Sequence, residues 1–375
     1  MNMTEKRAIV IGAGIVGLAT ARSLALKNYK VEVFERHPKA QGASVRNFGM
    51  VWPVGQPLGK LYERAIKSRS IWLEMAREGK IWHGETGRLH TAYLPEEMAV
   101  VEEFASKNTQ YEVLTPQETV NKSEAVVEKG LLGALWSDQE VIVDPRQAIC
   151  VLAEVLEERY NVSFHWNKAV TEVFYPKVKA GNKTYEADLI YVCSGSDFET
   201  LFPDEFEETG ITKCKLQMMR LVSQPDGWRI GPALCGGLSL VHYSSFTAMK
   251  SHAALKQYYD QKYANHLKWG LNVMVSQNGM GELTIGDSHE YGLDLEPFNK
   301  KEIDDMILQY LATFARFKDW TINSHWNGIY SKMQDGSTEI ILTPQDGVTI
   351  INGLGGAGMT LSFGLAEEVT AAVLN

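Results

Sequence analysis

The chain has 375 residues, of which 45% are hydrophobic and 22% charged, an ordinary globular composition. Its formal net charge of −9 disfavours nucleic acid as a general partner, and no apolar run approaches the roughly 18 residues of a membrane span. The first strand begins by residue 8 and leaves no room for a signal peptide, so we expect a soluble, cytoplasmic protein.

The segment 7–36, RAIVIGAGIVGLATARSLALKNYKVEVFER, has the pattern of a βαβ unit. A short apolar strand leads into a G-x-G-x-x-G turn and a helix, and a second strand ends at Glu35. Gly12 permits the tight turn, Gly14 the approach of a pyrophosphate, and Gly17 close packing of the helix on the sheet. The free N–H groups of the helix start face phosphates, and the Glu35 carboxylate suits ribose hydroxyls. This unit predicts dinucleotide binding, but it does not by itself separate NAD from FAD.

The chain between this unit and residue 160 departs from regular strand–helix alternation. We expect a helix over 59–78, a strand in GRLHTAYL, a helix over 95–108, and a strand followed by a capped helix over 111–126. A further helix is expected over 143–160, with Pro145 in its first turn. The turn-rich region from about 80 to 143 therefore predicts an inserted second domain.

Strand patterns dominate the rest of the chain. ADLIYVCSGS predicts a buried strand that ends in a small-residue turn, and QMMRLVS, LNVMVSQ and ELTIGDS are the strongest later strands. Helices are expected over 251–267 and 300–316. The chain closes with INGLGGAGMTLSFGLAEE, a strand, a Gly-rich turn and a helix. No acidic strand end follows this second turn, so it is not a second nucleotide-binding unit.

The N-terminal turn with its acidic strand end, ADLIYVCSGS, and GLGGAGMTLSFGLAEE together resemble the D-amino acid oxidase-like FAD oxidoreductases, which include glycine oxidase and sarcosine oxidase. SVRNFGMVWPVGQP and GLGGAGMTLSFGLAE resemble a narrower clade that is thought to act on aminophosphonates related to 2-aminoethylphosphonate. The resemblance implies an α/β fold in which a Rossmann-like FAD-binding domain is interwoven with an α+β substrate domain on a mainly antiparallel sheet. The FAD-binding domain is expected to comprise 1–80, 141–210 and 331–375, and the substrate domain 81–140 and 211–330.

The resemblance also implies a set of residues that hold FAD non-covalently. The first turn binds the pyrophosphate, Glu35 and Arg36 the adenosine side, QGASVRNFGM runs beside the isoalloxazine, and the closing turn wraps the pyrimidine edge. Backbone N–H groups of that closing turn suit the negative charge that flavin reduction places at N1–C2=O2. The expected FAD contacts are Gly12, Gly14, Ile15, Val16, Gly17, Glu35, Arg36, Ala43, Ser44, Phe48, Gly49, Met50, Val170, Ser194, Gly195, Leu354, Gly355, Gly356, Ala357, Gly358, Met359 and Thr360.

Two positions depart from the amino-acid-oxidising relatives. Those relatives carry W-x-G-x-R-P before the closing turn, where the Arg binds the substrate carboxylate, but this chain reads WNGIYSKMQDG and has Tyr330 there. Glycine oxidase-like proteins place another Arg inside the closing turn, at the position of Gly356. Both expected carboxylate anchors are absent, which disfavours an ordinary α-amino acid as the substrate.

Other residues are therefore candidates for the substrate. Clustered Arg and Lys suit a phosphonate, which has three acceptor oxygens, although a lone cation is more often an ordinary surface residue. Arg46 is the preferred anchor because its loop borders the flavin. His289 is a candidate proton acceptor or substrate hydrogen-bonding group, against the alternative of a structural histidine. The substrate-binding candidates are Arg46, Asn47, Trp52, Arg69, Arg220, Tyr330 and Lys332, and no metal site is expected.

The reaction implied is oxidation of a small amine: a hydride leaves the carbon beside the nitrogen for flavin N5, and the imine hydrolyses to a carbonyl compound. The expected substrate is an aminophosphonate or its N-methyl derivative, an anionic small molecule, and the electron acceptor is oxygen or another oxidant. Three alternatives stay open: a glycine- or sarcosine-type oxidase, an NAD-binding dehydrogenase, and a flavin-binding protein without catalysis.

Overall fold

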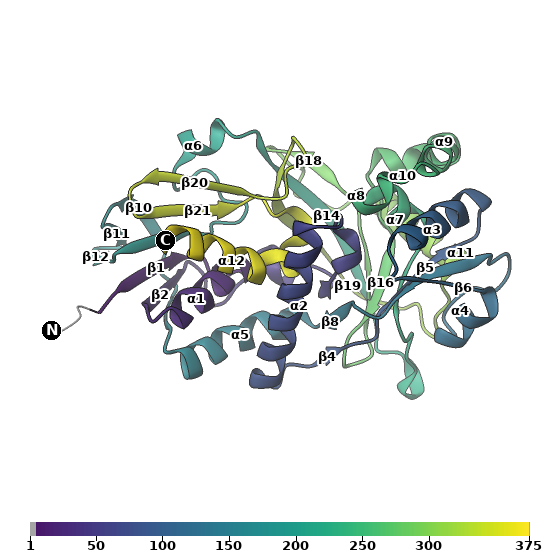
Figure 1. Cartoon of the computed structure of the whole chain (residues 1–375), viewed down its shortest axis with the longest axis horizontal. Helices are drawn as coiled ribbons and strands as arrows, with labels where there is room; N and C mark the ends of the chain where they lie inside the picture. The colour runs from purple at the N-terminus through teal and green to yellow at the C-terminus, as the bar shows by residue number, and fades with distance from the viewer. Residues whose placement is uncertain (1–4, 375) are drawn as a thin grey trace.

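The computed structural model describes residues 5–374 and is built on two large sheets (Figure 1). The first has six strands in the order β20-β21-β13-β1-β2-β9, parallel except for β20 at its edge. Its strands are β1 Arg7–Ile11, β2 Lys30–Glu35, β9 Ser163–Trp166, β13 Leu189–Val192, β20 Ile340–Gln345 and β21 Val348–Asn352. The expected N-terminal βαβ unit is confirmed, and the closing strand β21 returns to the same sheet beside β13.

Helices cover one face of this sheet and a small β-sheet covers the other. The helices are α1 Ile15–Leu26, α2 Lys60–Gly79, α5 Pro145–Tyr160 and α12 Gly358–Leu374, whose apolar residues form one continuous core with the sheet. The small sheet comprises β10 Val170–Phe174, β11 Lys177–Ala180 and β12 Lys183–Glu186. Because both faces are covered, the central parallel strands are almost uniformly apolar, as the sequence predicted.

The second sheet has nine strands and lies in the other half of the molecule (Figure 1). Its order is β18-β14-β17-β16-β15-β5-β7-β6, with β19 also paired to β14, and every pairing is antiparallel except β15–β5. The expected fold class is confirmed. The strands are β5 Arg88–Ala92, β6 Glu112–Leu114, β7 Gly133–Ser137, β14 Ile211–Leu221, β15 Ala233–Cys235, β16 Met274–Gln277, β17 Leu283–Gly286, β18 Glu290–Gly292 and β19 Ile322–Met333.

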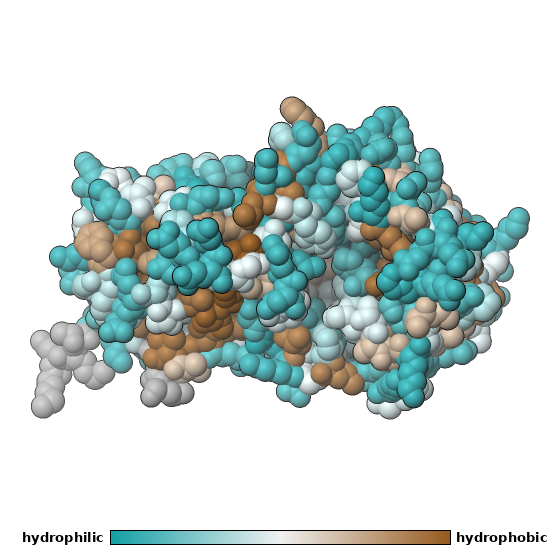
Figure 2. Space-filling view, turned by 90° about the horizontal axis from the view of Figure 1, so that it is seen from above, coloured by the Kyte–Doolittle hydropathy of each residue, from teal (hydrophilic) through white to brown (hydrophobic). Residues whose placement is uncertain are grey.

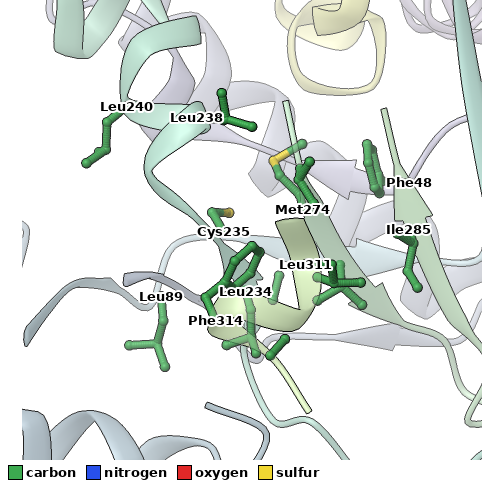
Figure 3. Packing of buried hydrophobic residues seen from close by; sticks show 14 of the residues in the cluster. Phe48, Leu89, Leu234, Cys235, Leu238, Leu240, Met274, Ile285, Leu311 and Phe314 are labelled. Atoms are coloured by element: carbon green, nitrogen blue, oxygen red, sulfur yellow. The ribbon is translucent and has the colours of Figure 1, made fainter. Parts of the chain in front are cut away.

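The two faces of the nine-stranded sheet have different neighbours. On one face, Leu89, Leu234 and Ile285 share a side with Leu311 and Phe314 of α11 (Lys301–Phe314) in the apolar core (Figure 3). On the other face, Met274 points toward Phe48 of the loop after β2 (Figure 3). The Ser276 hydroxyl donates to the Phe48 carbonyl at 3.1 Å, which fixes this loop on the sheet. We call this second side the loop-facing side of the sheet.

The helices that the sequence predicts are present except at one point, and three short helices, over 203–207, 237–242 and 244–247, are additional to them. The expected single helix over 251–267 is wrong: it is broken at Tyr263 into α9 His252–Lys262 and α10 Ala264–Lys268, because Tyr263 leaves helical geometry at φ −124°. The expected capped helix is confirmed, since Thr115 and Glu118 cap each other's backbone N–H at the start of α4. The other α-helices are α3 Pro95–Lys107, α4 Pro116–Lys122, α6 Pro203–Glu207, α7 Gly237–His242 and α8 Ser244–Thr247. The 3₁₀ turns are Ala43–Val45, Pro53–Gly55, Pro225–Gly227 and Gly355–Ala357. A small sheet contains β3 Met50–Val51, β8 Val141–Val143 and β4 His83–Gly84.

Glu97 joins α3 to the rest of the second half through a buried hydrogen-bond network. Its carboxylate accepts from the Tyr259 hydroxyl at 2.5 Å and from the Tyr93 backbone N–H at 2.6 Å. Removing it leaves buried donors without partners. We expect Glu97→Ala to lower the free energy of unfolding by about 3 kcal/mol in urea titrations. Glu102→Ala, at an exposed position on the same helix, is the control, and equal loss in both variants would contradict the role of the network.

Hydrophilic side chains cover most of the face shown in Figure 2, and an apolar patch interrupts them on the half that holds the six-stranded sheet. None of the helices between residues 5 and 374 has the length and apolarity needed to cross a bilayer. In the same residues, no three His, Cys, Asp or Glu side chains are grouped to hold a metal ion.

Candidate functional site

A long cavity of about 300 Å³ runs along the carboxyl ends of β1, β2, β13 and β21. Its walls come from the first Gly-rich turn, the end of β2, the loop after it, the small turn after β13 and the closing turn. Ligands of open α/β sheets bind at this edge. Of the residues expected to hold FAD, those that line the cavity are Gly12, Gly14, Ile15, Val16, Glu35, Arg36, Ala43, Ser44, Val170, Ser194, Gly195, Leu354, Gly355 and Gly358.

The first turn is packed so tightly that Gly12 and Gly17 have no substitute. Gly12 has φ +105°, and a Cβ there would lie 2.4 Å from the Cys193 carbonyl oxygen. A Cβ on Gly17 would lie 1.9 Å from the carbonyl oxygen of Gly12, so Gly17 holds α1 against the turn and does not line the cavity. The Ile15 N–H at the start of α1 donates to the Ser44 hydroxyl at 2.9 Å. The helix N-terminus therefore opens onto the cavity with a neutral hydroxyl beside it, which suits a pyrophosphate.

Charged groups line the end of the cavity at β2, where the adenosine side of FAD is expected. The Glu35 carboxylate, at the end of β2, accepts from the backbone N–H groups of Ala13 at 3.0 Å and His37 at 3.1 Å. Arg36 forms an ion pair with Asp197 across the cavity. Sequence reasoning missed Asp197, although it directly follows the small turn that was expected here. Other lining residues that it missed include His37, Gln41, Lys168, Ser196, Ile329, Ser331 and Asn352.

The opposite end of the cavity is built on the closing turn. Asn352 donates to the Gly195 carbonyl at 2.9 Å and ties this turn to the one after β13. A Cβ on Gly356 would meet nothing closer than the Tyr330 hydroxyl at 3.6 Å, so small residues are not needed there for protein packing. The glycines of this turn that line the cavity, Gly355 and Gly358, have no side chain to keep a flat ring away from the backbone. Met359 and Thr360 lie behind the turn, where their backbone and hydroxyl oxygens accept from Trp72 and Trp52.

The family model for FAD-dependent oxidoreductases of the D-amino acid oxidase type (DAO) matches residues 7–372. The chain belongs to this family. The cavity of this DAO-family protein fits FAD, because a helix start that suits an anion, a carboxylate that suits ribose hydroxyls and a turn of small residues follow one another along it.

Solved structures support the same fold. Glycine oxidase from Geobacillus kaustophilus superposes with a TM-score of 0.77 at 16% identity, covering 98% of this chain and 95% of that one. L-proline dehydrogenase from P. horikoshii gives a TM-score of 0.77 at 18% identity, covering 98% and 94%. In sequence, 99 residues are 36% identical to a tRNA 5-methylaminomethyl-2-thiouridine biosynthesis bifunctional protein from Pseudomonas entomophila (strain L48). That match covers 25% of this chain and only 15% of the relative.

Two of the predicted substrate residues, Tyr330 and Lys332, lie beside the closing turn on β19. Residue Lys332 forms an isolated backbone bridge with Leu354, and a Cβ on Gly355 would lie 3.7 Å from the Lys332 side chain. The Lys332 Nζ donates to the Tyr291 hydroxyl at 3.3 Å. Burial raises the pKa of Tyr330 well above its ordinary value, so the phenol stays neutral. Of these residues Tyr330 lines the cavity, whereas Lys332 and Tyr291 lie beside it and do not.

His289, the predicted proton acceptor, lies near the same end, after β17. Its Nδ1 is 2.7 Å from the Gly270 carbonyl oxygen, which can only accept, so Nδ1 carries the hydrogen and Nε2 keeps a free lone pair. Burial lowers the pKa of His289 to about 4, which keeps the imidazole neutral at pH 7. The His242 ring lies over it with the two ring centres 4.6 Å apart. Sequence reasoning missed His242, which ends the short helix α7.

The other predicted cations lie elsewhere. Arg46 is exposed, and its Nη1 donates to the Asn327 carbonyl at 3.2 Å on β19. Arg69 on α2 donates to the Gln139 carbonyl at 2.5 Å and pairs with Glu85. Arg220 lies on the loop-facing side of the sheet, over the Trp326 ring and near Glu282. None of the three lines the cavity.

The remaining predicted residues support the loop between β2 and α2. The Asn47 side chain donates to the carbonyls of Ala43 and Ser44 and accepts from the Gly49 N–H, so it fixes the loop. Phe48, Gly49, Met50 and Trp52 are buried in the same loop, away from the cavity wall. Their roles as contacts of FAD or substrate stay predictions.

Proposed function

We propose that this DAO-family protein oxidises the C–N bond of a small anionic amine, a compound related to 2-aminoethylphosphonate or its N-methyl derivative. FAD supplies the hydride acceptor when it is bound. The imine product hydrolyses in water to a carbonyl compound and an amine. The observation that carries the proposal is the redox end of the cavity, where Tyr330 and Gly356 stand in place of the two arginines that would hold an amino-acid carboxylate.

His289 is the proposed proton acceptor. An amine must lose its ammonium proton before a hydride can leave the adjacent carbon. A neutral imidazole with a fixed Nδ1–H and a free Nε2 lone pair is suited to take that proton. The ammonium group of Lys332 adds a positive field at the same end, which attracts an anionic substrate and disfavours a second positive charge on the amine.

Anaerobic mixing tests this function directly. The purified holoprotein is expected to show the visible absorption bands of oxidised flavin. Adding 2-aminoethylphosphonate or its N-methyl derivative is expected to bleach them, and the carbonyl product is identified by mass spectrometry. Glycine and sarcosine are the matched amines with a carboxylate. Bleaching by these two alone would overturn the substrate class, and a flavin that no amine bleaches would overturn the amine oxidation.

A further inference from the structure

A wholly buried guanidinium without a hydrogen-bond partner in the described chain lies on the loop-facing side of the nine-stranded sheet. Arg88 and His90 of β5 are 0% exposed. Among the described residues, none of the three guanidinium nitrogens of Arg88 and neither ring nitrogen of His90 has a hydrogen-bond partner. The indole nitrogen of the neighbouring Trp52 is buried and unpartnered as well. So many unmet donors in one place are rare in protein interiors, where nearly all buried polar groups are paired.

The register of the sheet connects this cluster to the flavin loop. His90 pairs with Cys235, Cys235 with Met274, and Met274 with Gly286, so these residues form one row across the loop-facing side. At the far end of the row, a Cβ on Gly286 would lie 3.3 Å from the Phe48 ring. At the near end, the Arg88 guanidinium carbon lies 5.9 Å from the centre of the Trp52 ring. The Trp52 backbone N–H donates to Thr360 in the closing turn at 2.9 Å, so the cluster adjoins the turn assigned to the flavin.

The chemistry of the cluster indicates the group that it takes. Arg88 and the Trp52 indole offer hydrogen-bond donors only, and the planar guanidinium matches a carboxylate or phosphonate. Glu140 is the nearest carboxylate, but its oxygen lies 3.8 Å from Arg88 Nε, beyond hydrogen-bonding distance. Glu140 is also 0% exposed, and this long ion pair leaves the Arg88 guanidinium N–H groups without hydrogen-bond acceptors among the described residues. Buried N–H groups of this kind call for an acceptor, which an anionic group supplies.

A second cavity, of about 190 Å³, lies on the outer side of Tyr111, and none of Arg88, His90 and Trp52 lines it. The Tyr111 ring centre is 5.8 Å from the Arg88 guanidinium carbon, so this ring separates the cavity from Arg88. The Ser245 hydroxyl in the cavity wall is buried and has no hydrogen-bond partner in the described chain.

We propose that Arg88, with His90 and the Trp52 indole N–H, binds the acidic group of the substrate. This assignment rests on the proposed oxidation of an anionic amine. It places the acidic end of the molecule at β5 and leaves the amine end toward the flavin turn and His289. Each of the four cations suggested by the sequence has at least one hydrogen-bond partner, whereas Arg88 has none between residues 5 and 374.

Binding of methylphosphonate by the holoprotein tests this site, since methylphosphonate has the acidic group and no amine to oxidise. Titration calorimetry and the flavin absorption spectrum report its Kd. We expect Arg88→Gln to raise the Kd at least about tenfold, because it removes charged hydrogen bonds, while the FAD content stays unchanged. Arg77→Gln, an exposed arginine on α2, is the matched control and is expected to bind like the unchanged protein. His90→Asn is expected to weaken binding severalfold and serves as the test if Arg88→Gln does not fold.

Two results would overturn the assignment. One is a holoprotein that binds no methylphosphonate, in which case the cluster holds only water. The other is binding that survives unchanged in Arg88→Gln, or in His90→Asn where that variant replaces it. The outcome is separable from the test of the function: if no amine bleaches the flavin but methylphosphonate still binds through Arg88, the oxidation is wrong and the anion site stands.

Discussion

Replacing Gly17 by alanine is expected to abolish FAD retention. Gly17 lies in α1, where alanine is normally preferred over glycine by about 1 kcal/mol. Here the added Cβ would lie 1.9 Å from the Gly12 carbonyl oxygen, which belongs to the backbone and cannot rotate away. The helix must therefore move off the turn, and the start of α1 no longer meets the pyrophosphate.

The measurements are the flavin absorbance of the purified variant and its free energy of unfolding, which we expect to fall by about 2–3 kcal/mol. Gly84→Ala on β4 is the control, since its Cβ would meet side chains at an ordinary 3.5 Å. A Gly17→Ala protein that is yellow and more stable would show that helix preference decides at this position and that the close packing does not hold the turn.

Replacing His289 by asparagine is expected to lower kcat for amine oxidation about 100-fold while FAD binding is retained. Asparagine can still donate to the Gly270 carbonyl, as His289 Nδ1 does at 2.7 Å, but it has no basic nitrogen in place of Nε2. His83→Asn is the matched control, because His83 Nδ1 also lies near a backbone carbonyl, that of Ile81 at 3.1 Å, but His83 stands on β4 in the small sheet with β3 and β8. Equal kcat in His289→Asn and the unchanged protein would remove His289 from catalysis.

The pH dependence provides a second readout of His289. Burial lowers its pKa to about 4, so the base is neutral above that pH and becomes protonated below it. We therefore expect kcat to decrease only as the pH falls toward 4. If the base were an exposed histidine, kcat would already decrease near pH 6.5, about the ordinary pKa of the side chain. This decrease is expected to disappear in His289→Asn. The free energy of unfolding also decreases as the pH falls from about 6.5 toward 4. In this range the unfolded chain binds a proton at His289 and the folded protein does not, so protonation favours the unfolded state.

Much of the fold could be predicted because its signals are local. The G-x-G-x-x-G turn, the cap at Thr115 and the apolar parallel strands each lie within a few residues, and the structure has them where the sequence predicted. The single helix expected over 251–267 was wrong because apolar spacing continues through Tyr263 although the backbone turns there. Spacing reports which face is buried and does not report a break between two helices that bury the same face.

In the candidate site, too, the residues that lie in local sequence patterns could be predicted and those that come together from distant segments could not. The residues that present backbone to the cofactor lie in contiguous Gly-rich segments, so most of those expected from the sequence do line the cavity. The residues that act through side chains come from separate segments. Asp197 reaches Arg36 and His242 reaches His289 only after long stretches of chain have folded between them. Arg46, preferred from the sequence because its loop borders the flavin, points instead to the Asn327 carbonyl on β19.

The sequence alone determined the βαβ unit, the Gly-rich turn at the end of the chain, and the absence of arginine at positions 330 and 356. Tertiary structure decided which charges are solvated and which are buried. Arg88 carries no motif, and its position in GRLHTAYL resembles that of any strand residue. Within the described chain, Arg88 is buried without a hydrogen-bond partner because β5 pairs with β15 and the loop through Trp52 covers the guanidinium. Burial is a property of that assembly, and no local pattern in the chain reports it.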